Sequence, residues 1–320
     1  MLDFNDILST PNLNVQTFIG QAQTTAGAAT GEWKTWVKPR GVKFVYMIAV
    51  GGAASGGCAL NSGTRSGGGP GGGSGAQSTL FIPATFLPDI LYIQAGLGGA
   101  QPATLVSAAV GVAGTITYVS VEPWNTLAAA STVLFASPGT ATTAATTTTG
   151  GTGGTAAVIA TIANMPVAGR GFYQFFAGSA GSAGGPNNGV GSAQTYPTSG
   201  LMVMGGSGGG GQQAGTSNFD GGAILGVGFG DNYPTIAGGT AAVTSTPAGA
   251  GSGGTMLKPF QYTGGTGGGG SSNTAGGVAG AGGNGAPGCG GGGAGGSNTT
   301  VNTLARPGDG GPGFVYIYSW

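Results

Sequence analysis

Side chains that could carry acid–base, nucleophilic or metal chemistry are scarce in this chain. The 320 residues include no histidine, and 8 acidic side chains balance 8 basic ones, so the formal net charge is zero. General acid–base catalysis needs a titratable group beside the reacting atom, and histidine is the group most often used. We therefore expect a protein that is not an enzyme and that uses no cofactor and no metal.

The two cysteines, Cys58 and Cys289, lie inside glycine tracts. Without histidine, a zinc site at these positions would need carboxylates as further ligands, and a catalytic thiol would lack a base. Two small buried thiols are the simplest interpretation, and a single disulfide between the two tracts is the alternative.

The charge pattern also bears on the partners of the chain. A zero net charge provides no basic face for phosphates, so we expect no nucleic-acid partner. No run approaches the roughly 20 apolar residues of a spanning helix, and the first residues are acidic where a signal peptide is basic. One short basic cluster remains, which is either a patch for anionic lipopolysaccharide or a solvated strand face paired with Glu32 or a neighbouring subunit. It contains Lys34, Lys38, Arg40 and Lys43.

The elements that must position any functional residue are short strands separated by glycine. The chain contains 76 glycines and 17 prolines, and glycine costs about 1 kcal/mol per helical position relative to alanine. We therefore predict a mainly β and irregular fold with very little helix. β-Branched and aromatic runs predict the strands, with the first and last of them paired. These runs are residues 43–50, 79–82, 90–94, 115–121, 131–136, 157–162, 172–176, 201–204 and 314–320.

The glycine tracts predict polyglycine II-type helices. The main tracts are residues 67–75, 205–211, 264–270 and 276–296, and in the last one every third residue from Gly276 is glycine or alanine. Three residues per turn is the repeat of this extended helix, which forms no internal hydrogen bonds. Its buried N–H and C=O groups must therefore find partners on neighbouring segments. We predict a bundle of such helices, cross-linked by backbone hydrogen bonds, rather than flexible linkers.

Three motifs combine an apolar run with glycines. Residues 36–41 (WVKPRG) are followed by an apolar run and two glycines, residues 86–99 (FLPDILYIQAGLGG) end in a glycine cluster, and residues 308–320 (GDGGPGFVYIYSW) close the chain. These motifs resemble those of glycine-rich bacteriophage tail proteins. The chain is also similar to tail-fibre tip adhesins of some T-even-like phages. These resemblances imply a virion protein with polyglycine helices that carries receptor-binding segments.

The chain divides into an N-terminal arm, residues 1–31, and a glycine-rich body, residues 32–320. An apolar arm this short cannot bury a core alone, so we expect it to dock on a neighbouring chain of a homo-oligomer, with a trimer implied only by the resemblance. Its docking residues would be Leu2, Phe4, Leu8 and Phe18. Aromatic residues beside Asn, Gln and Asp in the body are candidate receptor contacts, with packing over a small core as the alternative. They are Tyr196, Tyr233, Phe260 and Tyr262.

Two functions fit these features. The first is a tail-fibre or tail-tip protein that binds a host surface glycan or outer-membrane protein. The second is a capsid decoration, head-fibre or tail-assembly protein without receptor binding. Both place the chain in the virion, in contact with other virion proteins. An antifreeze protein is a third and more distant alternative, because irregular segments interrupt any long flat face.

Overall fold

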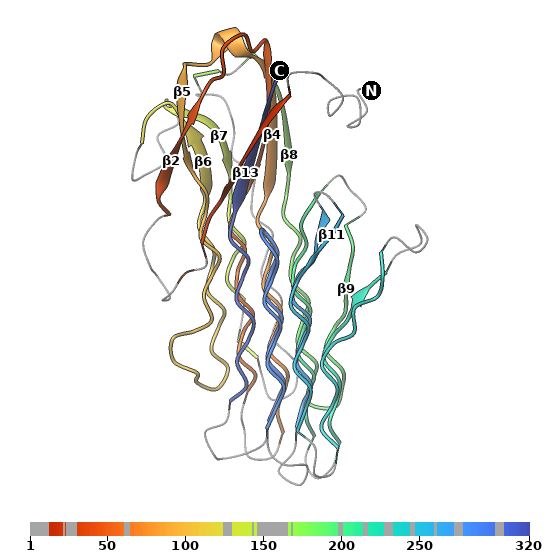
Figure 1. Cartoon of the computed structure of the whole chain (residues 1–320). Helices are drawn as coiled ribbons and strands as arrows, with labels where there is room; N and C mark the ends of the chain where they lie inside the picture. The colour runs from red at the N-terminus through yellow and green to blue at the C-terminus, as the bar shows by residue number, and fades with distance from the viewer. Residues whose placement is uncertain are drawn as a thin grey trace.

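The computed structural model describes residues 13–21, 23, 31–60, 65–123, 130–142, 144–145, 166–167, 169–197, 201–213, 217–226, 233–243, 247–258, 261–271, 278–297 and 304–320. The chain is mainly β, with 28% strand and almost no helix, as the composition predicted. A β-sandwich forms one end of the molecule, and extended glycine-rich segments run side by side away from it (Figure 1).

A five-stranded antiparallel sheet joins the two ends of the chain. Its order is β1 (Asn14–Ile19), β13 (Phe314–Ser319), β3 (Phe44–Val50), β4 (Gln77–Pro83) and β8 (Phe172–Phe176). The predicted pairing of the first long apolar run with the last one is confirmed, because β3 lies beside β13 with Met47 opposite Ile317.

A four-stranded antiparallel sheet completes the sandwich, in the order β2 (Trp33–Val37), β5 (Ile90–Gln94), β6 (Thr117–Ser120) and β7 (Thr132–Ala136). Buried side chains of both sheets, among them Trp36, Met47, Leu80, Ile93 and Leu134, form the core between them. The remaining elements are short: η1 (Ala84–Phe86), the parallel pair β9 (Gln194–Thr195) and β10 (Ile224–Leu225), and the antiparallel pair β11 (Met256–Lys258) and β12 (Gln261–Tyr262).

Backbone hydrogen bonds beyond the sandwich repeat every three residues. In residues 51–58, successive N–H groups donate to three neighbouring segments in turn. The first neighbour accepts, at Ala76, Gly73 and Pro70, from Gly51, Ala54 and Gly57 respectively. The second accepts, at Thr115, Val112 and Ala109, from Gly52, Ser55 and Cys58. The third accepts, at Gly311 and Gly308, from Ala53 and Gly56. This rotation is that of a helix with three residues per turn whose bonds all go to its neighbours. The predicted polyglycine arrangement is therefore present. We call residues 51–58, together with the extended segments beyond the sandwich that bond to one another in this way, the polyglycine array.

Glycine is required where these segments touch. A Cβ atom built on Gly265 would overlap the Gly283 carbonyl group and lie 2.8 Å from the Gly292 backbone nitrogen. Where a side chain does fit, it replaces a backbone partner: the Ser207 hydroxyl donates to the Gly222 carbonyl at 2.6 Å and accepts from the Gly267 N–H at 3.0 Å. The close approach of neighbouring backbones therefore explains both the high glycine content of the array and the way in which its segments pack.

Three of the sequence expectations need comment. The strand predicted at residues 201–204 is wrong: the Met202 N–H bonds to the Gln77 side chain and the Met204 carbonyl to Gly290, so its partners change along the segment as in the array. Residues 157–162 lie outside the described residues. Strands β1 and β2 were not predicted, and β1 places part of the N-terminal arm in the chain's own sheet.

Candidate attachment surface

One face of the five-stranded sheet points away from the sandwich core and is rich in aromatic residues. Directly opposite residues on neighbouring strands lie on the same face of a sheet. The register therefore aligns a row across all five strands, in the order Val15, Tyr318, Tyr46, Phe81 and Phe172. The two ends of this row are exposed, Val15 by 44% and Phe172 by 78%, whereas Tyr318 in between is buried.

Four rings near the end of the sandwich form what we call the aromatic surface: Phe44, Phe81, Phe172 and Trp320. Phe44 and Phe81 stack with centroids 5.5 Å apart and planes 14° apart, and Phe81 lies 6.0 Å from Trp320 at 23°. The Phe44 side chain is 38% exposed.

The three rings Phe44, Phe81 and Trp320 contact one another, with centroids 5.5 to 6.2 Å apart. Aromatic side chains contribute much of the binding energy of protein interfaces. The aromatic surface is therefore suited to a protein partner.

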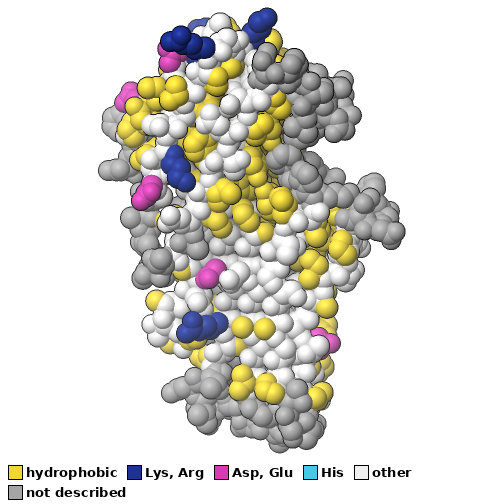
Figure 2. Space-filling view, viewed as in Figure 1, with side chains coloured by type: hydrophobic (Ala, Val, Ile, Leu, Met, Phe, Trp, Pro, Cys, Tyr) yellow, Lys and Arg dark blue, Asp and Glu magenta, His cyan; other side chains and the backbone are white. Residues whose placement is uncertain are grey.

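Basic residues border this surface, and one of them is already paired. The Lys38 ammonium group lies 3.0 Å from the Asp89 carboxylate and donates to the Leu87 carbonyl at 2.8 Å. Lys34 does not border this surface, because it donates to the carbonyl of Ile19, at the opposite end of the sheet, at 3.2 Å. Arg40 and Lys43 are exposed, and basic side chains are visible at this end of the molecule in Figure 2. The border of the surface therefore favours a partner that carries acidic groups beside apolar ones.

The tyrosines predicted as receptor contacts lie mostly in a second core. Tyr196 and Tyr262 are buried at 3% and 6% exposure, among residues that pack the outer face of β3 and β13 against the array. The Tyr196 hydroxyl donates to the Pro234 carbonyl at 3.2 Å, and its ring lies 5.1 Å from that of the half-buried Tyr233. Tyr196 and Tyr262 therefore follow the alternative interpretation, packing in a core. Phe260 lies outside the described residues.

The Tyr262 hydroxyl lies 2.5 Å from the Tyr316 hydroxyl, and burial raises the pKa of Tyr262 above its usual value of 10.0. The Tyr262 phenol is therefore neutral at physiological pH and acts as a hydrogen-bonding group within the core.

The predicted docking arm is only partly within the described residues. Leu2, Phe4 and Leu8 lie outside them. Phe18 is described, and the prediction for it needs correction. It sits in β1 opposite Val315 and is buried in the sandwich core at 8% exposure, because β1 pairs with the chain's own C-terminal strand. Phe18 thus docks on its own chain rather than on a neighbour.

Both cysteines are buried free thiols, which confirms the simplest interpretation of the sequence. Desolvation raises the pKa of Cys58 to about 11 and that of Cys289 to about 12. The Met204 N–H donates to the Cys289 sulfur and lowers its pKa, but this effect is smaller than that of desolvation. Within the described ranges, no group of three or more Cys, Asp or Glu side chains is placed to hold a metal ion.

Comparisons with known proteins found no family model that matches this chain and no match among curated proteins. Within the described part of the chain, no helix is long and apolar enough to cross a membrane.

Proposed function

We propose that this chain is a bacteriophage virion protein that forms part of a tail fibre or tail tip and serves in host attachment. The observation that carries the proposal is the elongated body, in which the polyglycine array extends from the sandwich (Figure 1). Its segments are cross-linked through their backbones, which makes a stiff spacer that needs few apolar side chains. The resemblance of three sequence motifs to glycine-rich phage tail proteins supports the same proposal.

The aromatic surface supports an orientation for this body. Exposed apolar groups with a basic border mark protein interfaces more often than free surface. We infer that the sandwich end docks on another virion protein or on further copies of the chain. The array then extends outward from the docked end, toward a host surface glycan or outer-membrane protein.

Immunogold labelling of intact particles with an antibody against residues 33–320 tests the proposal. We expect label at the tail tip or fibre ends, together with inhibition of adsorption by the same antibody. Label spread over the head would replace a tail role by a decoration or head-fibre role. Complete particles without label would overturn the assignment to the virion.

Replacing Phe44 and Phe172 together by aspartate is expected to leave the fold intact and to prevent incorporation into particles. Neither side chain belongs to the two buried cores, so both cores stay intact, whereas a buried aromatic contact at an interface is worth about 2 kcal/mol or more, roughly thirtyfold in binding. Protein per particle, measured by quantitative immunoblotting of purified virions, checks the prediction.

The matched control for that double variant is Val190→Asp, a change at an exposed side chain outside the sandwich, in the segment between β8 and β9. Its incorporation should equal that of the unaltered chain. Equal incorporation of the Phe44 and Phe172 variant would show that the aromatic surface is not the docking site.

A further inference from the structure

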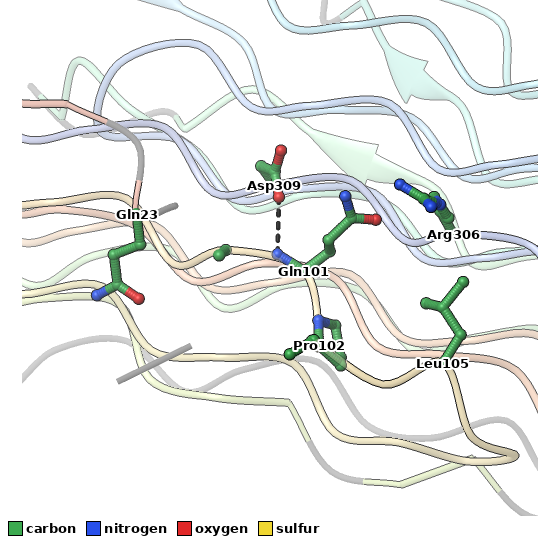
Figure 3. Close-up of a pocket in the computed structure, with 8 residues that line it drawn as sticks. Gln23, Gln101, Pro102, Leu105, Arg306 and Asp309 are labelled. Atoms are coloured by element: carbon green, nitrogen blue, oxygen red, sulfur yellow. Dashed lines mark hydrogen bonds between the residues drawn. The ribbon is translucent and has the colours of Figure 1, made fainter. Parts of the chain in front are cut away.

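A polar pocket of about 310 Å³ lies on the flank of the molecule, where three segments meet (Figure 3). Gln23 follows β1, Gln101 follows β5, and Arg306 and Asp309 belong to the last segment of the array before β13. Backbone bonds hold the first two segments together, since the Gln23 N–H donates to the Gly98 carbonyl at 3.0 Å. The pocket is thus formed by three segments that are far apart in the sequence, rather than by a single loop.

Asp309 fixes the centre of the pocket. One of its carboxylate oxygens accepts from the Gln101 N–H at 2.7 Å, and its own N–H donates to the Asn284 side-chain oxygen at 2.9 Å. The dashed line in Figure 3 marks the first of these bonds, from which the Gln101 side chain extends toward Arg306. The Asp309 carboxylate is therefore positioned before any ligand arrives, which lowers the entropic cost of binding to it.

Two amide oxygens of residues that line the pocket are enclosed by the protein. The Oε1 atoms of Gln23 and Gln101 are buried, and no described residue donates a hydrogen bond to either. Gln23 as a whole is only 8% exposed. Buried polar atoms in folded proteins nearly always have a partner, and exceptions call for an explanation such as a bound molecule. A turn of either side chain toward the pocket would bring its amide group into contact with a ligand that carries hydrogen-bond donors.

The size and charge of the pocket narrow the chemistry of that ligand. A volume of 310 Å³ is far larger than one structural water needs, since a water molecule in the liquid takes up roughly 30 Å³. It falls at the lower end of the range for ligand pockets, about 300–1,000 Å³. Asp309 and Arg306 balance in charge, which disfavours an anion. A single carboxylate with a guanidinium on the same short segment is a poor cation site, because calcium takes about six to eight oxygen ligands.

We propose that this pocket binds a neutral sugar, one ring of a glycan. Hydroxyl groups both donate and accept, so they can pair with the amides of Gln23 and Gln101, with the Asp309 carboxylate and with the Arg306 guanidinium. Pro102 and Leu105 provide an apolar wall for the C–H groups of the ring. The inference rests on the proposed function, since the sugar would be part of the host receptor, and it places this contact on residues other than the predicted tyrosines.

Saturation-transfer NMR on the purified full chain tests this site with three probes: methyl glucoside, methyl galactoside and methyl mannoside. N-acetylneuraminic acid serves as the anionic comparison. We expect saturation transfer to at least one neutral probe. Gln101→Leu and Arg306→Ala should each weaken its binding about tenfold, the loss that corresponds to one hydrogen bond of a charged or buried group. Arg306 is exposed, so its replacement should not affect folding.

Lys43→Ala, which changes an exposed cation of the sandwich, is the matched control and should bind the probe as the unaltered chain does. Transfer to no neutral probe, transfer to the anion alone, or equal transfer in Gln101→Leu and Arg306→Ala would each overturn the sugar site. Failure of the proposed function looks different: particles would lack the chain in immunogold labelling while the purified chain still bound the sugar.

Discussion

Gly265→Ala is expected to lower the free energy of unfolding by about 3 kcal/mol, the upper end of the usual cost of overpacking a core. The new Cβ atom would overlap the backbones of Gly283 and Gly292, which belong to two different segments of the array. Backbone on both sides cannot turn aside as a flexible side chain does, so the segments must separate and their hydrogen bonds lengthen. Chemical denaturation followed by circular dichroism measures the change.

Gly253→Ala is the matched control, because the nearest atom to its added Cβ is the Asn284 carbonyl oxygen at 3.9 Å, an ordinary contact. Its unfolding free energy should stay within about 0.5 kcal/mol of the original, as for most surface substitutions. Similar losses for the two variants would contradict the idea that close backbone approach, rather than glycine content as such, holds the array together.

Raising the pH from neutral to 11 is expected to destabilise the fold by about 5 kcal/mol through the two thiols alone. Desolvation raises the pKa of Cys58 from 9.0 to about 11 and that of Cys289 from 9.0 to about 12. Above pH 9 the unfolded chain releases these protons while the folded chain retains them. Stability is therefore complete below pH 9 and falls by about 1.4 kcal/mol per pH unit and thiol until each folded-state pKa is reached.

Buried tyrosines continue this trend at higher pH, since burial also raises the pKa of Tyr173, Tyr262 and Tyr318. Denaturant titrations at a series of pH values give the profile. A double variant, Cys58→Ala with Cys289→Ala, should start less stable because of the cavities it leaves, but its profile should be flatter between pH 9 and 11. A profile that is level to pH 11 in the unaltered chain would contradict this account.

The sequence predicted the strands and the array well because each leaves a local pattern. β3 and β13 are continuous runs of β-branched and aromatic residues, and the array repeats small residues every third position. The ends of β5 and β8 were even placed correctly, at Ile90–Gln94 and Phe172–Phe176. Residues 201–204 have the same local pattern as a strand, but their neighbours are array segments, and only the tertiary arrangement determines that.

The candidate site was predictable only in part. Whether β1 pairs with its own chain or with a neighbour depends on the free edge of β13, which no local pattern reveals. In the sequence, Tyr196 and Tyr262 have polar neighbours, as surface contacts do. In the structure, they are buried in the core that packs against the outer face of the sheet. A signal for the aromatic outer face did exist: residues 314, 316, 318 and 320 are all aromatic. In a strand, this spacing places them on one face.

The polyglycine array also sets how this protein should respond to cold. Unfolding it exposes mainly peptide groups, whose hydration lowers the heat capacity, whereas unfolding an apolar core raises it. The heat-capacity change per residue should therefore be smaller than in ordinary globular proteins, and the curve of stability against temperature broader. Because backbone hydrogen bonds do not weaken on cooling as the hydrophobic effect does, the array should keep its stability at temperatures where apolar cores begin to lose theirs.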